Sequence, residues 1–172
     1  MIGSCGGSEK VAMVKSKFGF DAAIDYKAHN TKDQLKAALK ETAPEGIDMY
    51  FDNIGGYHFE AAFESLRPFG RIAVCGGISQ YNTVPEPVKI NPLAMIYSCQ
   101  RVEGFVCFAW LKSGKFLGEF AELVKQGKLH IEETFFDGIE NWGVGFNALF
   151  TGKNVGKVVV RVGKPKDDSL MR

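Results

Sequence analysis

The chain has 172 residues, of which 45% are apolar and 24% charged, and its formal net charge is +1. This composition is that of a globular protein with a real core, and the small net charge argues against a nucleic-acid partner, which requires a basic surplus or patch. No apolar run approaches the roughly 20 residues of a membrane-spanning helix, so we expect no membrane partner.

Short apolar runs alternate with helical patterns along the first two thirds of the chain. Strands are expected at 1–5, 21–26, 47–53, 71–75 and 102–107, and helices at 8–19, 31–43, 58–68 and 92–100. Thr31, with Gln34 three residues later, predicts a helix start, and Pro68 and Gly70 predict a helix end. Strands separated by helices in this way indicate a parallel, doubly wound α/β sheet that is covered on both faces.

The last third has a different pattern. A helix at 114–128 precedes two strand-like segments, HIEETFF and KVVVRV, which flank a helix that starts at Asn141. We expect these two strands to form a separate, partly antiparallel sheet beyond a boundary near residue 128. The mixed-charge residues 163–172 are expected to be a frayed tail.

The cysteines and histidines give no sign of a metal site. Cys5, Cys75, Cys99 and Cys107 form no C-x-x-C pair, and three of them lie in apolar segments, so buried, inert thiols in a reducing, cytoplasmic compartment are expected. No secretory leader is visible at the N-terminus. The three histidines, His29, His58 and His130, lack convergent carboxylates and are expected at the surface, whereas Asp52 is a candidate hydrogen-bonding residue at a strand end.

Four expected strand ends carry glycine or small polar residues: 6–8, 53–56, 76–77 and the stretch after Gly104. The carboxyl ends of parallel strands share one edge of the sheet, and ligands bind there. A run of four such ends predicts an extended ligand along this edge.

The first strand end suggests a phosphate site. No acid stands in the turn Gly6-Gly7-Ser8, which leaves room for the 2'-phosphate of NADP, and Lys10 can offer an ammonium group beside the helix N-terminus. Glu9 fits an interaction with the helix dipole. The alternative is a plain tight turn with a solvated Lys10, and Tyr26 can lie against an adenine or simply pack.

Several motifs together carry a family resemblance: GGSEK, FDNIGG, RIAVCGGISQYN, VEGFV and GKNVGKVVV. The chain resembles the zinc-independent medium-chain dehydrogenase/reductases, specifically the prostaglandin reductase and alkenal double-bond reductase group, from residue 2 to about 162. In that family a GroES-like substrate domain and the first Rossmann strand come first. The resemblance therefore implies a C-terminal portion: residues 1–128 form a Rossmann-type nucleotide-binding domain that lacks its first strand, and 129–172 supply C-terminal elements of the GroES-like catalytic domain.

The resemblance also implies roles for individual residues. Ser8 and Lys10 resemble the 2'-phosphate contacts of NADP(H), and Tyr97 matches a tyrosine that hydrogen-bonds the substrate carbonyl, where a phenol stabilises the negative charge left by hydride addition. The alternative for Tyr97 is a helix tyrosine whose hydroxyl meets water. The remaining coenzyme contacts implied are Tyr26, Asn53, Cys75, Gly76, Gly77, Ile78, Ser79, Gln80, Tyr81, Phe105, Val106, Cys107 and Asn154.

The activity implied is NADPH-dependent reduction of the carbon–carbon double bond of α,β-unsaturated ketones and aldehydes, the small-molecule enone and enal substrates, with no metal. The resemblance further implies a homodimer formed through the strand at 102–107. Two alternatives stay open: a truncated nucleotide-binding or dimerisation module without activity, and a quinone reductase of the same superfamily.

Overall fold

The computed structural model describes residues 1–84, 86–112 and 114–163. The chain divides into two compact units, Met1–Glu122 and Leu123–Arg172. The boundary falls within helix α6 (Lys115–Lys125), a little before residue 128. The tail expected at 163–172 lies, apart from Gly163, outside the described residues.

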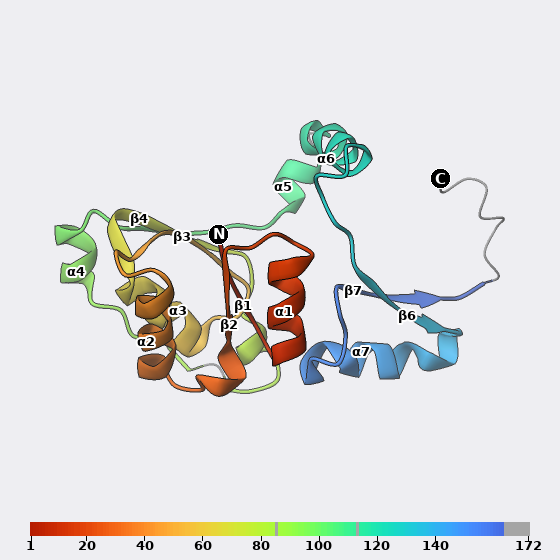
Figure 1. Cartoon of the computed structure of the whole chain (residues 1–172), viewed down its shortest axis with the longest axis horizontal. Coiled ribbons are helices and arrows are strands. Elements are labelled where there is room, and N and C mark those ends of the chain that lie inside the picture. Colours follow the sequence, from red (N-terminus) through yellow and green to blue (C-terminus); the bar gives the residue numbers. More distant parts are fainter. Residues whose placement is uncertain (85, 113, 164–172) are drawn as a thin grey trace. The chain divides into compact units, whose positions relative to one another are not determined.

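The first unit contains the five strands expected there, and every pairing between them is parallel (Figure 1). One sheet has the order β1-β2, and a second has the order β3-β4-β5. Among the described residues, no strand joins the two sheets between β1 and β3. The fold is thus a doubly wound parallel sheet without its first strand, as the resemblance implies. The strands are β1 (Ile2–Cys5), β2 (Ala22–Asp25), β3 (Ile47–Asp52), β4 (Leu66–Val74) and β5 (Arg101–Gly104).

Helices connect successive strands and provide the core. They are α1 (Ser8–Ser16), α2 (Lys32–Thr42), α3 (Gly56–Glu64), α4 (Pro92–Tyr97) and, after β5, α5 (Phe108–Leu111), with 3-10 turns η1 (Tyr26–Ala28) and η2 (Ile78–Gln80). Thr31 caps α2 as expected, since its Oγ1 accepts the amide N–H of Gln34 at 3.3 Å. One buried cluster joins β2, α2 and α3 through Ile24, Leu35, Ala38 and Ala61, and another joins α3 and β4 through Phe59, Phe63, Leu66 and Ile72.

The junction between α3 and β4 differs from the expectation. The helix ends at Glu64, and β4 begins at Leu66, so Pro68 and Gly70 lie inside the strand. The amide of Ile47 donates to the carbonyl of Ser65 at 2.9 Å, and the register between β3 and β4 shifts just beyond this point. A long-range pairing therefore ends the helix early, and the irregular start of the strand tolerates a proline.

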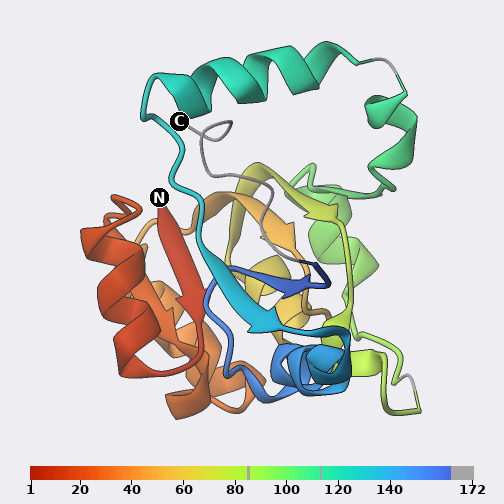
Figure 2. The same ribbon diagram turned by 90° about the vertical axis from the view of Figure 1, so that its right-hand side faces the viewer.

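The second unit contains β6 (Glu133–Asp137), the turn η3 (Ile139–Asn141), α7 (Trp142–Thr151) and β7 (Lys157–Arg161). β6 and β7 pair in parallel with Phe135 opposite Val159, so the described residues do not show the partly antiparallel sheet that was expected here. Helix α7 lies along the two strands and returns the chain to the starting end of β6 (Figures 1 and 2). Parallel strands need a long crossover connection, and α7 provides it here.

The cysteines are less buried than expected. Cys5 is half-buried, whereas Cys75, Cys99 and Cys107 are exposed, and all four are free thiols. The three exposed thiols lie at or beyond strand and helix ends, where packing is sparse. Among the described residues, no helix is long and apolar enough to cross a membrane.

Candidate functional site at the carboxyl edge of the sheets

The end of β1 is a turn in which the backbone approaches its neighbours closely. A Cβ atom on Gly6 would lie 2.8 Å from Cε of Lys27 and 2.9 Å from the hydroxyl of Tyr26. Gly7 has φ +96°, a conformation that favours glycine, and the space beside its Cα is open. Ser8 then starts α1, whose first turn contains Lys10. The turn thus presents helix N–H groups and open space, which suits an anionic group.

An acid from the neighbouring strand completes this turn. Oδ1 of Asp25 accepts the amide N–H of Gly7 at 2.9 Å and that of Lys27 at 3.0 Å. Burial raises the pKa of the Cys5 thiol, the charge of Asp25 raises it further, and Lys10 opposes them. Asp25 and Lys10 therefore both act at the end of β1. Asp25 was not predicted as part of this site, because it ends β2 and is distant in the sequence from the turn that follows β1.

The end of β3 is organised by a fully buried carboxylate. Oδ1 of Asp52 accepts the hydroxyl of Tyr50 at 3.1 Å and the amides of Ile54 and Gly55 at 2.9 and 3.0 Å. This confirms the hydrogen-bonding role expected for Asp52. Its Oδ2 is buried without a hydrogen-bond partner in the described residues. The carboxylate fixes the glycine turn that leads into α3 and leaves Asn53 exposed beside it.

His58 in the first turn of α3 is not at the surface, contrary to expectation. It is only 4% exposed, and its ring lies 4.5 Å from that of Tyr57 and 5.2 Å from that of Tyr26. Burial lowers its pKa, and the charge of Asp52 opposes the shift. Tyr26, which the sequence placed either on a ligand or in packing, is thus held by an aromatic contact that links the ends of β2 and β3.

The loop after β4 is joined to the end of β3 by backbone hydrogen bonds. The amides of Cys75 and Gly76 both donate to the carbonyl of Asp52, and the amide of Ile78 donates to that of Asn53. Ser79 donates both its amide and its hydroxyl to the carbonyl of Ile54. The structure therefore brings Asn53 and the segment from Cys75 to Tyr81, which includes Gly77 and Gln80, into one continuous rim.

The two tyrosines of interest lie at opposite ends of the sheet. Tyr81 is on the rim, and its hydroxyl accepts the amide of Gly77 at 3.1 Å. Tyr97 is 83% exposed at the end of α4. The carbonyl of the next residue, Ser98, accepts the amide of Phe69 near the start of β4. The structure thus places Tyr97 toward the amino edge and does not bring it to the other predicted site residues.

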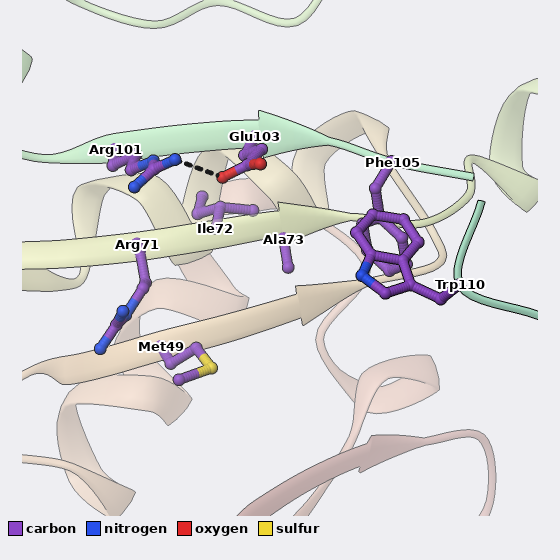
Figure 3. Close-up of a pocket in the computed structure, with 8 residues that line it drawn as sticks. All are labelled: Met49, Arg71, Ile72, Ala73, Arg101, Glu103, Phe105 and Trp110. Carbon is purple, nitrogen blue, oxygen red and sulfur yellow. Dashed lines mark ion pairs between the residues drawn. The ribbon is translucent and has the colours of Figure 1, made fainter. Parts of the chain in front are cut away.

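The end of β5 borders a shallow pocket on one face of the sheet. The amide of Phe105 donates to the carbonyl of Val74 at 3.1 Å, and Val106 and Cys107 follow as exposed residues. Figure 3 shows Phe105 and Trp110 at the carboxyl ends of the strands. The ion pair of Arg101 and Glu103 lies along β5, nearer to the start of that strand. The pocket holds about 280 Å³, and its lining is Met49, Arg71, Ile72, Ala73, Arg101, Glu103, Phe105 and Trp110. Of the predicted site residues only Phe105 lines it, so it is not the predicted rim.

Asn154 belongs to the second unit, where its side-chain amide donates to the carbonyl of Gly156 at 2.8 Å. Within the described residues, no group of three histidine, cysteine, aspartate or glutamate side chains is placed to hold a metal ion. The described residues therefore do not fit a zinc centre.

Comparison with known proteins gives consistent matches. The family model described as zinc-binding dehydrogenase matches residues 1–125. Prostaglandin reductase 1 from Bos taurus is 41% identical over 94% of this chain and 49% of its own length. The NADP(+)-dependent 2-alkenal reductase of Nicotiana tabacum is 41% identical over 95% of this chain and 47% of its own length. The chain spans about half the length of these relatives.

A solved structure agrees with the fold. The crystal structure of CurA from Vibrio vulnificus in complex with NADPH is 35% identical to this chain, with a TM-score of 0.83. The match covers 95% of this chain and 50% of CurA. A quinone oxidoreductase structure from Pseudomonas syringae, 17% identical with a TM-score of 0.74, shares the fold alone.

Proposed function

The chain belongs to the zinc-binding dehydrogenase family, and from this premise we propose that it is the coenzyme-binding part of an NADPH-dependent reductase of α,β-unsaturated ketones and aldehydes. The observation that carries the proposal is the set of glycine turns at the ends of β1, β3 and β4. The first of these turns leads into the N-terminus of α1, which bears Lys10. The same proposal is supported by the similarity to proteins named prostaglandin reductase and 2-alkenal reductase. It is also supported by the similarity to CurA, whose structure contains NADPH.

The end of β1 is the proposed site of the 2'-phosphate. The open space beside Gly7 admits a group there, Ser8 and Lys10 provide a hydroxyl and an ammonium, and Tyr26 borders the same turn. The Asp25 oxygen nearest to the turn already accepts two backbone N–H groups, which offsets part of its repulsion toward a phosphate.

The remaining predicted contacts follow the rim. Asn53 is proposed beside the ribose, and the segment from Cys75 to Tyr81 along the nicotinamide half, as the resemblance implies. Phe105, Val106 and Cys107 are proposed at the nicotinamide carboxamide, and Asn154 from the second unit as a residue that closes over the coenzyme.

NADPH supplies the hydride when it is bound. The chain must orient it and stabilise the negative charge that develops on the substrate oxygen. A phenol is a suitable donor, and its position favours Tyr81 over the predicted Tyr97. The hydroxyl of Tyr81 accepts from Gly77, which leaves its own hydrogen free to donate toward a ligand.

A comparison of two lysines on one helix tests the coenzyme site. Lys10 lies in the first turn of α1 and Lys15 in its last turn. We expect Lys10→Ala to weaken NADPH binding by about ten-fold, the equivalent of one charge-assisted contact. NADH lacks the 2'-phosphate, so its affinity should be unchanged, and Lys15→Ala should change neither. Fluorescence titration of the 172-residue chain measures all six affinities; equal loss for both coenzymes, or no loss, contradicts the assignment of Lys10.

A second candidate is a coenzyme-binding module that does not turn over a substrate. Its supporting observation is that the chain spans only about half of its relatives. Incubation of the chain with NADPH and an enone separates the candidates, because binding without loss of NADPH absorbance favours the module. A parallel assay with a quinone tests the quinone reductase alternative.

Two finer assignments complete the proposal. The four free thiols suit a reducing, cytoplasmic compartment.

A homodimer through β5 is supported by the position of that strand at the end of its sheet, where a twofold axis can extend the sheet across two copies. Light scattering after gel filtration measures the mass, and a monomer contradicts the dimer.

A further inference from the structure

The side chain of Lys27 folds back over the turn that ends β1. A Cβ atom on Gly6 would lie 2.8 Å from Cε of Lys27, so the lysine stem occupies the space that a side chain at residue 6 would take. Because the ammonium nitrogen is bonded to Cε, the positive charge of Lys27 lies at this turn as well. Lys27 was not among the site residues predicted from the sequence.

The 3-10 turn η1 explains why Lys27 reaches this place. Successive side chains of a strand point to opposite sides, whereas in a 3-10 turn they differ by about 120°. Tyr26 and Lys27 are the first two residues of η1, and a Cβ on Gly6 would also lie 2.9 Å from the hydroxyl of Tyr26. A phenol and an ammonium group therefore converge on the turn after β1.

The carboxylate of Asp25 joins the turns that follow β1 and β2. Its Oδ1 caps η1 by accepting the amide of Lys27 at 3.0 Å, and it accepts the amide of Gly7 at 2.9 Å. In the part of the chain that the structure describes, no hydrogen bond or ion pair occupies the ammonium of Lys27, and the residue is exposed. The backbone thus holds Lys27 beside Gly7 and leaves its charge available to a ligand.

The charges around the turn favour a second cation. A phosphate monoester carries roughly two negative charges near pH 7. Asp25 adds a negative charge beside the same turn, and Lys10 in the first turn of α1 offers one positive charge. With Lys10 alone, a bound phosphate would leave the site with an excess of negative charge. The ammonium of Lys27 reduces this excess and can donate a charge-assisted hydrogen bond, the stronger kind, to the phosphate.

We propose that Lys27 is a specificity-determining residue of the coenzyme site, whose ammonium binds the 2'-phosphate of NADP(H) from the β2 side of the turn while Lys10 binds it from the α1 side. The inference rests on the proposed function, because it concerns the same phosphate. It adds a contact from the end of β2 to those expected at the start of α1. The preference for NADPH over NADH then depends on two lysines from different elements, held together by Asp25.

Two nucleotides that differ only in the 2'-phosphate test the proposal on the 172-residue chain. Adenosine 2',5'-bisphosphate contains this group, and adenosine 5'-monophosphate lacks it. Lys27→Met keeps an apolar stem over Gly6 and removes the charge, whereas Lys27→Arg keeps the charge. In titration calorimetry we expect Lys27→Met to weaken binding of the bisphosphate by about ten-fold and that of the monophosphate by less than about two-fold. Lys27→Arg should stay close to the unmodified chain for both nucleotides.

A lysine at the other end of α1 provides the matched control. Lys15 lies in the last turn of the helix, so Lys15→Met makes the same change of net charge away from the turn after β1. We expect it to leave both affinities close to those of the unmodified chain. Circular dichroism checks that Lys15→Met and Lys27→Met are folded.

Phosphorus NMR reports on the charge at the phosphate itself. The second pKa of a phosphate monoester is about 6, and neighbouring ammonium groups lower it because they stabilise the dianion. A pH titration of the bound bisphosphate follows the 2'-phosphate signal. We expect the pKa of this phosphate to rise toward its value in free solution in Lys27→Met and to stay unchanged in Lys15→Met. A lysine that only packs against Gly6 would not move this pKa.

Three results would overturn the proposal. Equal loss of both nucleotides in Lys27→Met would mean that Lys27 only supports the turn, and unchanged affinity for the bisphosphate would mean that its ammonium does not contact the phosphate. In either case, a loss of the bisphosphate alone in Lys10→Ala would leave the proposed coenzyme site intact. The third result, no preference of the unmodified chain for the bisphosphate, would overturn the proposed NADPH site together with the role of Lys27.

Discussion

Gly6 ends β1 at a point where an added methyl group has almost no room. Its Cβ would lie 2.9 Å from the hydroxyl of Tyr26, whose ring is held against His58. We expect Gly6→Ala to lower the free energy of unfolding by about 1–3 kcal/mol, the usual effect of overpacking. Urea denaturation measures this difference.

Gly104, at the end of β5, is the matched control. A Cβ there meets nothing within 4 Å. Gly104→Ala should therefore change the free energy of unfolding by less than about 0.5 kcal/mol. If Gly6→Ala lowers the free energy of unfolding as little as Gly104→Ala does, the close contact at Gly6 is relieved without strain.

His58 makes stability depend on pH in a definite direction. Burial lowers its pKa in the folded state, so in mildly acidic solution the unfolded chain binds a proton there more readily than the folded chain does. The contribution of His58 to stability is thus full above the ordinary histidine pKa of about 6.5 and falls as the pH drops below it. His58→Phe keeps a ring against Tyr26 and Tyr57 and cannot titrate.

The measurement is the free energy of unfolding, from urea titrations at about pH 8 and pH 5.5, on either side of that value. We expect the unmodified chain to lose more stability between these pH values than His58→Phe does. Carboxylates titrate in both proteins, so only the difference between the two slopes reports on His58. Equal slopes would mean that His58 titrates in the folded state much as it does in the unfolded chain.

At the scale of elements, α2 depends on its first residues. Oγ1 of Thr31 accepts the amide of Gln34, and Oε1 of Gln34 accepts the amide of Asn30. Thr31→Ala removes the cap and should lower the free energy of unfolding by about 1 kcal/mol. Thr31→Ser keeps the hydroxyl and should stay close to the unmodified chain. If serine loses as much as alanine, the methyl group of Thr31 matters more than the hydrogen bond.

The sequence predicted those elements that depend on local patterns. The cap at Thr31 and the five strands of the first unit were confirmed, because turn residues and apolar runs lie within a few positions of one another. The early end of α3 was missed because it depends on Ser65 and Ile47, which are distant in the sequence. The parallel pairing of β6 and β7 was predictable in principle, since a helix between two strands favours a parallel crossover.

In the candidate site, too, features that follow from local patterns were predictable, and features that depend on contacts distant in the sequence were not. The glycine turns and the rim from Asn53 to Tyr81 follow from strand order, so their proximity was predictable. The carboxylate of Asp25 at the end of β1, the burial of His58 and the separation of Tyr97 from Tyr81 depend on how helices and loops pack. Patterns along one segment carry no information about such contacts, so only the structure could place these residues.

At the scale of the whole chain, the sheet face that bears Met49, Phe51 and Phe105 should govern the association of copies of the chain with one another. Met49 and Phe51 are 58% and 57% exposed, and Phe51 lies next to Phe105. The isoelectric point is about 7.6, where charge repulsion between copies is smallest. We therefore expect light scattering at fixed concentration to peak near that pH and to fall toward about pH 6 and pH 9.

Two variants with the same change of charge separate the apolar face from the net charge. Phe51→Lys places a charge on that sheet face, whereas Val84→Lys does so at a loop residue that is 87% exposed. Both raise the isoelectric point alike, so both should shift the scattering peak to higher pH. Only Phe51→Lys should also lower its height, because only it interrupts a contiguous apolar patch. Peaks of equal height for the two variants would show that another surface drives the association.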